Sequence, residues 1–188
     1  MKKLTAGELQ TAYQQGQRNF QNSDLRAIDL FEAALPDIDL QGSCLVATYL
    51  PYANLSQAKL ARLQGQRIEL SNAQLYQADL SEANLQESQC VRSNFRYANL
   101  RSADLRHANL RGADFYQADL READLRGADL TSTNLDQARL AGAQLQQANL
   151  FRAKAPDLSQ AFYDRTTLMP DGCQASDQGD FVHGLTAG

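Results

Sequence analysis

The sequence predicts an all-β fold of the solenoid type, a β-helix whose first coil is covered by an N-terminal α-helix. The main support is a period of five. From Phe20 to Leu150, every fifth residue is Leu or Phe at 25 of 27 positions, and only Gly65 and Cys90 depart from this rule. Two residues before each of these positions stands a small side chain, which is Ala at 16 of the 27 positions and Ser or Thr at 6. Between the two stands Asp or Asn in many pentads, as in Ala-Asp-Leu at residues 103–105.

This spacing excludes both a helix and a flat strand. Apolar residues that alternate in steps of two and three scatter around a helix, which advances about 100° per residue. On a flat strand, the step of three would turn alternate pairs to the opposite side. A very short strand followed by a corner satisfies both steps, with the small residue and the Leu inward and the residue between them outward. A chain that turns the same way every five residues winds into a solenoid.

The segment before the repeat, residues 1–17, predicts a capping helix over residues 4–15. The signals for its start and stop are a capping box, a hydrophobic staple and a terminal glycine, formed by Thr5 with Glu8, Leu4 with Leu9, and Gly16. We expect this helix to cover the first coil, because the unpaired backbone groups of that coil would otherwise be open to other chains.

The β-helix itself is predicted over residues 18–155. A terminal coil and closure follow over residues 156–172, and a flexible tail over residues 173–188. After Leu150 the repeat shifts its phase and resumes at Leu158, Tyr163 and Leu168. The core is expected to consist of the central residues of the pentads, among them Phe95, Leu100, Leu105, Leu110 and Phe115. In one pentad, Leu63 and Gly65 exchange the large and small positions, which roughly conserves the core volume.

The repeated order of Ala, Asp or Asn, Leu and two free residues resembles the pentapeptide-repeat family, over roughly 140 of the 188 residues. The helix and the turn at residues 16–20 resemble the entry into the repeat in cyanobacterial members. The resemblance implies a right-handed quadrilateral β-helix with four pentads, or about 20 residues, per coil and therefore about seven to eight coils. Coils of this length would stack Phe95 on Phe115 and place Asp119 beside Arg139.

Composition predicts the state of the cysteines, the distribution of charge and the cellular location. Cys44, Cys90 and Cys173 form no CxxC motif, and we expect free thiols. The formal net charge of −4 falls in residues 155–188, because residues 1–154 hold 17 acidic and 17 basic residues. There is no run of 18 apolar residues and no apolar segment after the first three residues, so we expect a cytoplasmic protein without a membrane span or signal peptide.

The sequence contains no constellation that predicts catalysis, a cofactor or a metal site. His107 and His183 are isolated, and no Gly-rich loop, nucleophile elbow or zinc motif occurs. The repeated Asp residues are interpreted as structural, because Asn occupies the same slot in other pentads and both side chains form hydrogen bonds at turns. We therefore expect no enzyme.

Six arginines occupy the first corner position of their pentads, and six carboxylates share the same stretch. The arginines are Arg96, Arg101, Arg106, Arg111, Arg121 and Arg126, and the carboxylates are Asp104, Asp114, Asp119, Glu122, Asp124 and Asp129. The local charge is therefore zero, which favours a self-paired surface over direct binding of nucleic acid. A partner-binding patch is the alternative interpretation.

One column of side chains is a candidate for protein contact. With a coil of about 20 residues, Tyr76, Arg96 and Tyr116 would lie in one column with Tyr97 beside it. Tyr and Arg are enriched at the centres of interfaces, and cation–π contacts form within such a column. Ordinary stacking between coils, with no partner, is the alternative.

Two functions follow from these observations. The first is a rigid, non-enzymatic scaffold that binds an unidentified protein, as a regulatory or assembly factor. The second follows from the resemblance, since some family members mimic duplex DNA and modulate DNA gyrase, as quinolone-resistance proteins do. We favour the first function, because a DNA mimic needs a strongly acidic face and the repeat is balanced in charge. The sequence predicts neither the oligomeric state nor the segregation of charges onto different faces.

Overall fold

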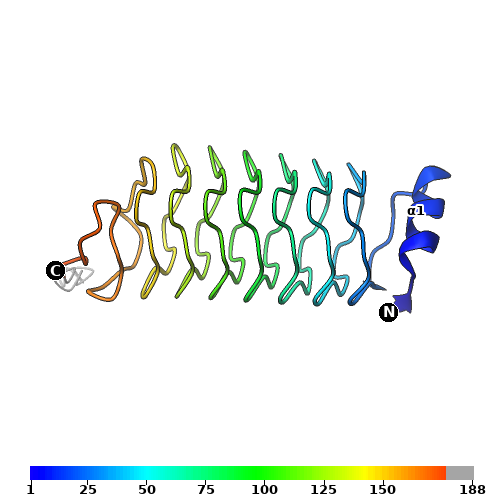
Figure 1. Cartoon of the computed structure of the whole chain (residues 1–188), viewed down its shortest axis with the longest axis horizontal. Coiled ribbons are helices and arrows are strands. Elements are labelled where there is room, and N and C mark those ends of the chain that lie inside the picture. Colours follow the sequence, from blue (N-terminus) through cyan, green and yellow to red (C-terminus); the bar gives the residue numbers. More distant parts are fainter. Residues whose placement is uncertain (177–188) are drawn as a thin grey trace, which may run out of the picture.

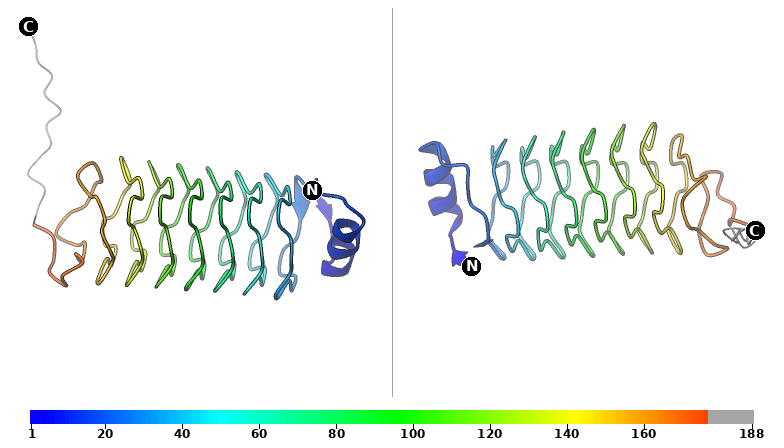
Figure 2. Two further views of the ribbon diagram at one scale, coloured as in Figure 1. Left: turned by 90° about the horizontal axis from the view of Figure 1, so that it is seen from above. Right: turned by 180° about the vertical axis from the view of Figure 1, so that it is seen from behind.

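The protein is a rod of stacked coils with a helix at one end (Figure 1). The computed structural model describes residues 1–176 of the chain. Its named elements are β1 (Lys2–Lys3), α1 (Ala6–Gln14) and β2 (Ser23–Asp24). All later coils run as very short extended segments between turns, and two further views show the same regular stacking from above and behind (Figure 2). Within the described residues, no helix is both long and apolar enough to cross a membrane.

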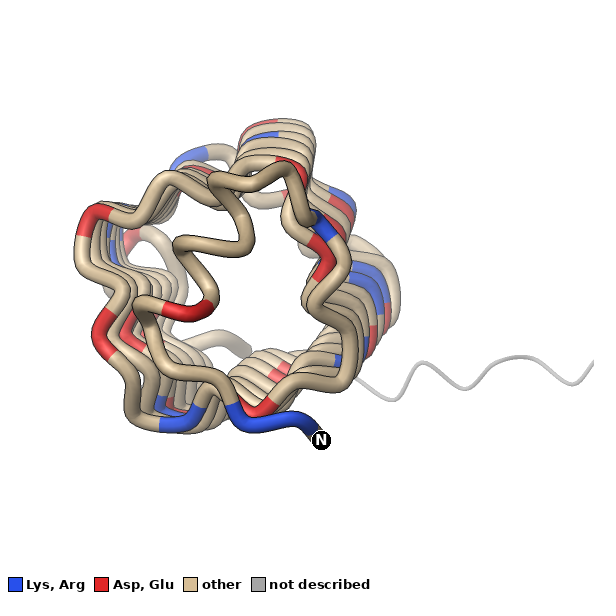
Figure 3. The backbone as a smooth tube through the Cα atoms, turned by 90° about the vertical axis from the view of Figure 1, so that its right-hand side faces the viewer, with Lys and Arg blue, Asp and Glu red and all other residues tan. Residues whose placement is uncertain are grey.

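Successive coils are joined by parallel backbone bridges between residues that lie 20 apart. The series begins at Asn19 with Asp39 and continues without a break to Asn134 with Lys154. Each bridge lies at the outward residue of a pentad. A coil therefore contains four pentads, and the view along the rod shows a four-sided outline (Figure 3). The predicted length of one coil is thus observed, and the number of coils stays a prediction.

In the pentad of residues 98–102, every backbone N–H is bonded. Three of the five N–H groups donate to carbonyls of the neighbouring coils, at 2.8 to 2.9 Å, and the N–H of Ala98 donates to Phe95 within its own turn at 3.0 Å. The fifth belongs to Arg101, and it donates to Oδ1 of Asn99 at 3.2 Å. Because buried or partly buried N–H groups must be paired, the outward Asp or Asn completes the hydrogen bonding of the pentad.

The corners use a backbone conformation that the sequence did not predict. The second corner residue of every pentad, from Asn22 to Arg152, has a positive φ, and among them only Gly42, Gly112, Gly127 and Gly142 are glycines. A positive φ costs an ordinary L-residue on the order of 1 kcal/mol. At every corner from Asn22 to Ser132, the N–H of this residue donates to a carbonyl of the next coil, as Tyr97 does to that of Tyr116 at 3.0 Å. This bond and the packed core hold the strained conformation in place.

The core is a ladder of fully buried side chains along the axis of the rod. Leu100, Leu105 and Leu110 are buried, and the rings of Phe95 and Phe115 stack with centroids 4.9 Å apart. Leu63 is buried in the small-residue position of the pentad in which Gly65 replaces the large residue. A methyl group on Gly65 would lie 3.3 Å from Cδ2 of Leu63 and 3.1 Å from Cδ2 of Leu85. The side chain of Leu63 therefore fills the space beside Gly65.

The N-terminal cap begins as the sequence indicates and contains one element more. Thr5 and Glu8 form both bonds of the capping box, and Leu9 is fully buried against the first coil. Ahead of the helix, β1 pairs in parallel with β2 of the first coil. This strand was missed, because two exposed lysines give no alternating pattern. It covers part of the edge that the helix alone would leave open.

The C-terminal end differs from the prediction at one position. Phe162 bridges to Gln144, which places Tyr163 in the predicted phase, but Leu168 bridges to Asn149 and so occupies the outward slot. The turn between them contains one residue more than a regular corner, so the expectation of a core position for Leu168 is wrong. Leu168 also pairs antiparallel with Gln174, which folds the chain back over the last coil. Residues 177–188, most of the predicted tail, lie outside the described part of the chain.

Candidate protein-contact surface

The predicted column lies along one corner of the rod. Tyr76, Arg96 and Tyr116 are first corner residues of three successive coils, and Tyr97 is the second corner residue beside Arg96. The carbonyl of Arg96 accepts the N–H of Gln77 at 3.0 Å, and the carbonyl of Tyr116 accepts the N–H of Tyr97 at 3.0 Å. The backbone itself therefore fixes the spacing of these four side chains. We call them the tyrosine column.

The three tyrosine rings of this column form a row in which Tyr97 contacts each of the other two. The ring of Tyr97 meets that of Tyr76 edge to face, with centroids 5.5 Å apart and planes at 75°. It meets Tyr116 in the same manner, at 5.7 Å and 85°. Edge-to-face contacts of this geometry contribute about 0.5 to 1.5 kcal/mol each beyond buried area. The rings are thus ordered before any partner arrives.

Arg96 joins the aromatic rings to a carboxylate. Its guanidinium carbon lies 4.5 Å above the ring centroid of Tyr116 and 5.9 Å from that of Tyr97. Its Nη1 donates to Oδ2 of Asp114 at 3.1 Å, and this hydrogen bond raises the pKa of Arg96. The positive charge is therefore held in one place on the column, where it also makes a cation–π contact.

The tyrosine column is accessible but only partly exposed. Tyr97 is 40% exposed, and the other three side chains are half-buried. Two side-chain amides border the last ring, because Gln117 and Gln137 donate to the Tyr116 hydroxyl at 3.3 and 3.2 Å. A row of ordered Tyr and Arg side chains with a polar rim has the composition and rigidity of an interface centre.

The six arginines of the regular stretch all pair with carboxylates. Three patterns occur, of which the commonest is a bidentate pair within one pentad, as between Arg106 and Asp104 at 2.9 and 2.8 Å. The others join adjacent coils, as Arg101 does with Glu122 at 2.8 Å. The complete set is Arg96–Asp114, Arg101–Glu122, Arg106–Asp104, Arg111–Asp129, Arg121–Asp119 and Arg126–Asp124. The surface of this stretch is self-paired, which leaves little free positive charge there for nucleic acid.

Bonds from arginine lower the pKa of some of the paired carboxylates. The bond from Arg26 lowers the pKa of Asp24 to about 2. Hydrogen bonds from Arg121 lower the pKa of Asp119. For Asp104, partial burial opposes ionisation, but the bonds from Arg106 and Gln86 outweigh it and the pKa is lowered. These carboxylates are therefore structural acceptors and poor candidates for general acids.

A second group of aromatic side chains was missed by the sequence analysis. Phe31, Tyr49 and Tyr52 occupy three different slots of their pentads, but the corner brings them together. The centroid of Phe31 lies 6.3 Å from that of Tyr49 and 5.9 Å from that of Tyr52. Applying the 20-residue coil to every aromatic residue, rather than to one slot at a time, would have found this group.

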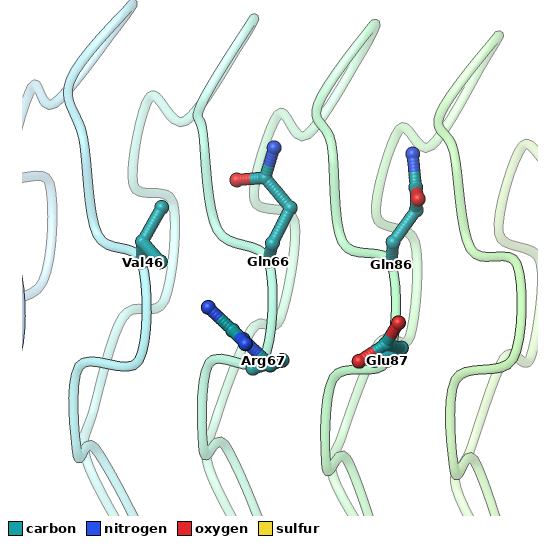
Figure 4. A pocket seen from close by; sticks show the side chains of 5 residues that line it. All are labelled: Val46, Gln66, Arg67, Gln86 and Glu87. Atoms are coloured by element: carbon teal, nitrogen blue, oxygen red, sulfur yellow. The ribbon is translucent and has the colours of Figure 1, made fainter.

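Several hollows lie on the surface of the described residues. One hollow, of about 350 Å³, lies on another side of the rod and is lined by Val46, Gln66, Arg67, Gln86 and Glu87, whose side chains are shown in Figure 4. Its lining contains no Ser, Thr, Cys, Lys or His side chain. His107 stands exposed at a corner, and His183 lies outside the described residues. Among residues 1–176, no group of three metal-ligating side chains lies close enough to hold an ion.

Comparison with known proteins agrees with the bridges and the pentad pattern. The model of the family described as pentapeptide repeats matches in eight copies, over residues 50–86, 73–112, 88–127 and 113–150. These matches span more than half of the chain. The chain belongs to the pentapeptide-repeat family. Pentapeptide-repeat proteins form right-handed quadrilateral β-helices, as the sequence resemblance implied.

Solved structures of other pentapeptide-repeat proteins are similar over most of the chain. HetL from Nostoc sp. strain PCC 7120, involved in regulation of heterocyst differentiation, is 30% identical, with 92% of this chain and 100% of HetL covered and a TM-score of 0.43. Rfr23 from Cyanothece 51142 is 22% identical, with coverage of 87% and 99% and a TM-score of 0.36. QnrB1, a plasmid-mediated fluoroquinolone resistance protein, is 16% identical, with coverage of 93% and 87% and a TM-score of 0.38. No match was found among curated proteins. These similarities carry no argument about the role of this chain.

Proposed function

We propose that this pentapeptide-repeat protein is a non-enzymatic scaffold that binds a protein partner through the tyrosine column, in a regulatory or assembly role. The observation that carries this proposal is the ordering of Tyr97 between Tyr76 and Tyr116. Side chains that are fixed before binding lose little conformational entropy when a partner covers them. The rigid backbone ladder beneath the column supports the same conclusion.

Modulation of DNA gyrase by DNA mimicry is the alternative function. The charge distribution does not favour it. A mimic of duplex DNA needs a continuous negative face. Here acidic and basic residues occur together on more than one side of the rod (Figure 3). In the regular stretch, Asp104, Asp119 and Asp124 are each engaged by an arginine of the same pentad. The remaining negative potential is therefore local rather than continuous.

Affinity capture from the native cell extract tests the proposal. The baits are the intact protein, a variant with Tyr76→Ala, Arg96→Ala and Tyr116→Ala, and the control Arg62→Ala, which removes the same charge from an exposed position at another corner. We expect a partner that the intact protein and the control retain and the triple variant loses. Capture of DNA gyrase subunits would favour the alternative function. Equal capture by all three baits, or no specific capture, would contradict the assignment of the column.

A further inference from the structure

A second aromatic surface lies near the N-terminal end of the rod. We call Phe31, Tyr49 and Tyr52 the N-terminal aromatic patch. Their exposed fractions are 47%, 46% and 56%, and they account for half of the large hydrophobic side chains that are exposed in residues 1–176. The others are scattered, at Met1, Tyr97 and Phe162. Single exposed apolar residues are normal, but a contiguous group indicates a binding surface.

The backbone places this patch on one corner and the adjoining face. The N–H of Glu32, next to Phe31, donates to the carbonyl of Pro51, next to Tyr52, at 3.0 Å. Phe31 and Tyr52 therefore flank the same corner in two successive coils. The ring of Phe31 lies nearly parallel to that of Tyr49, at 17°, and nearly perpendicular to that of Tyr52, at 74°. The three exposed rings are thus held at different orientations within one patch.

Carboxylates surround these rings. Tyr49 bridges to Asp29 in the coil before it and to Glu69 in the coil after it, so both carboxylates are its ladder neighbours. Glu32 follows Phe31 and is exposed. Asp29 accepts the N–H of Phe31 through Oδ1 at 2.9 Å, and Glu69 accepts the N–H of Ser71 through Oε1 at 2.9 Å. In each, the second oxygen is left for another donor.

These three carboxylates differ from those of the regular stretch in having no basic partner. Among residues 1–176, no Lys, Arg or His lies within ion-pair distance of Asp29, Glu32 or Glu69, whereas Asp119 pairs with both Arg121 and Arg139. Negative charge beside exposed aromatic faces attracts cations in two ways, by ion pairing and by cation–π contact. It repels the phosphates of nucleic acids and of acidic lipids.

We propose that the N-terminal aromatic patch binds a cationic, arginine-bearing segment of a protein partner. A guanidinium plane stacks on the faces of Phe31 and Tyr49, and its N–H groups donate to the open oxygens of Asp29 and Glu69. Glu32 supplies a further charge for the next basic residue of the segment. The proposal is independent of the tyrosine column, which occupies another corner, so either surface can fail without the other.

The test measures fluorescence anisotropy of a fluorescein-labelled peptide of alternating glycine and arginine residues, with the intact protein at about 0.15 M salt. The double variant Phe31→Ser with Tyr52→Ser is expected to weaken binding about tenfold, through lost stacking. The double variant Glu32→Gln with Glu69→Gln is expected to weaken it about fivefold. A thermal melt of each variant shows that the rod is folded.

Two matched controls separate the patch from general attraction between opposite charges. Glu82→Gln with Glu87→Gln removes the same charge from two other corners, and Tyr97→Ser removes a ring from the tyrosine column. Both controls are expected to bind the peptide as the intact protein does. Equal weakening by the two glutamine pairs, or no binding to the intact protein, would overturn the proposal. So would equal binding of a glycine and serine peptide, or a dimer that Phe31→Ser with Tyr52→Ser abolishes, because the patch would then serve a neutral partner or a second copy.

Discussion

The ring of Phe115 lies almost parallel to the ring of Phe95, with an angle of 3° between the planes and 4.9 Å between the centroids. The two residues are 20 apart and both are fully buried. Leucine fills the equivalent position in most other coils, so this pair places larger side chains in the core. The backbone bond from the N–H of Phe95 to the carbonyl of Asp114, at 2.8 Å, keeps the coils at ordinary spacing.

Shortening Phe115 should measure the packing of this pair. Phe115→Ala is expected to lower the free energy of unfolding by about 3 to 5 kcal/mol, because a cavity remains beside Phe95. Phe115→Leu restores the usual residue of the repeat and should cost less than about 1.5 kcal/mol. Urea unfolding followed by circular dichroism checks both values. A loss below about 1 kcal/mol for Phe115→Ala would mean that the coils close around the gap.

Gly127 and Gly112 form a matched pair for the strain at the corners. Both have positive φ, +68° and +66°, so alanine should cost about 1 kcal/mol at either. A methyl group at Gly127 would also lie 2.5 Å from Nδ1 of His107, whereas at Gly112 the nearest atom, Cγ of Arg92, is 3.5 Å away. We expect Gly127→Ala to be the more destabilising, and His107→Ala to remove the difference in a double-mutant cycle. Equal losses in the two single variants would show that the imidazole turns aside freely.

A charge in the core should unfold the rod, and the same charge outside it should not. Leu105→Lys places an ammonium group in a fully buried position without a partner. We expect a loss of cooperative unfolding or a fall in stability of at least about 4 kcal/mol. Gln117→Lys adds the same charge at an exposed corner and should change stability by less than about 0.5 kcal/mol. A thermal melt of Leu105→Lys that matches the wild type would contradict the inward orientation of this position.

The lowered pKa of Asp119 predicts that the free energy of unfolding depends on pH. The bonds from Arg121 hold the pKa of Asp119 below its ordinary value of 3.8 in the folded state. A carboxyl with a lowered pKa in the folded state stabilises the protein above 3.8, and this contribution disappears as the pH falls through the folded value. Asp119→Asn should therefore cost about 0.5 to 1 kcal/mol near neutral pH and progressively less below pH 3.8. Denaturant unfolding over a pH series tests this, with Asp136→Asn as the control, since the structure shows no ion pair of Asp136 among residues 1–176.

Cys90 should behave as an inert core residue. It is fully buried in a leucine position, and burial raises the pKa of its thiol to about 12. In a variant with Cys44→Ser and Cys173→Ser, the remaining thiol should react with Ellman's reagent only after denaturant is added. The wild type is the control, because its exposed Cys173 should react without denaturant. Reaction of Cys90 at the same rate in the folded and unfolded states would show that this coil opens readily.

The phase of the coils was predictable because the core constrains every pentad in the same manner. The inward leucines and the small residues beside them fill the core, and the Asp or Asn between them forms hydrogen bonds at the turn. The tyrosine column was predicted from the coil length of about 20 residues, and its side chains do lie together. That this column binds a protein stays a prediction, because an interface also depends on the surface of the partner.

Other features left no sequence signal. In a sequence, Gly or Asn is the usual sign of a positive φ, but many corners of this chain carry Glu, Arg, Gln or Tyr. The core and the bonds between coils determine the backbone there. The pairing of β1 with β2 depends on the position of α1, which lies between the two strands in the sequence. Leu168 left the predicted phase because one extra residue in a surface turn changes no apolar pattern. The N-terminal aromatic patch required the three-dimensional corner, which joins residues from different slots.

The spacing of 20 between bridged residues sets the unit by which this rod can change in length. A deletion of one whole coil leaves every later side chain on the side of the rod that it now occupies. A deletion of one pentad also preserves the buried leucine pattern, yet it rotates all that follows by a quarter turn relative to the N-terminal cap. Gain or loss of single repeats would therefore leave the fold intact while it moved one binding surface around the axis relative to the other. The rotational position of a surface, rather than its composition, is the property that such changes would alter first.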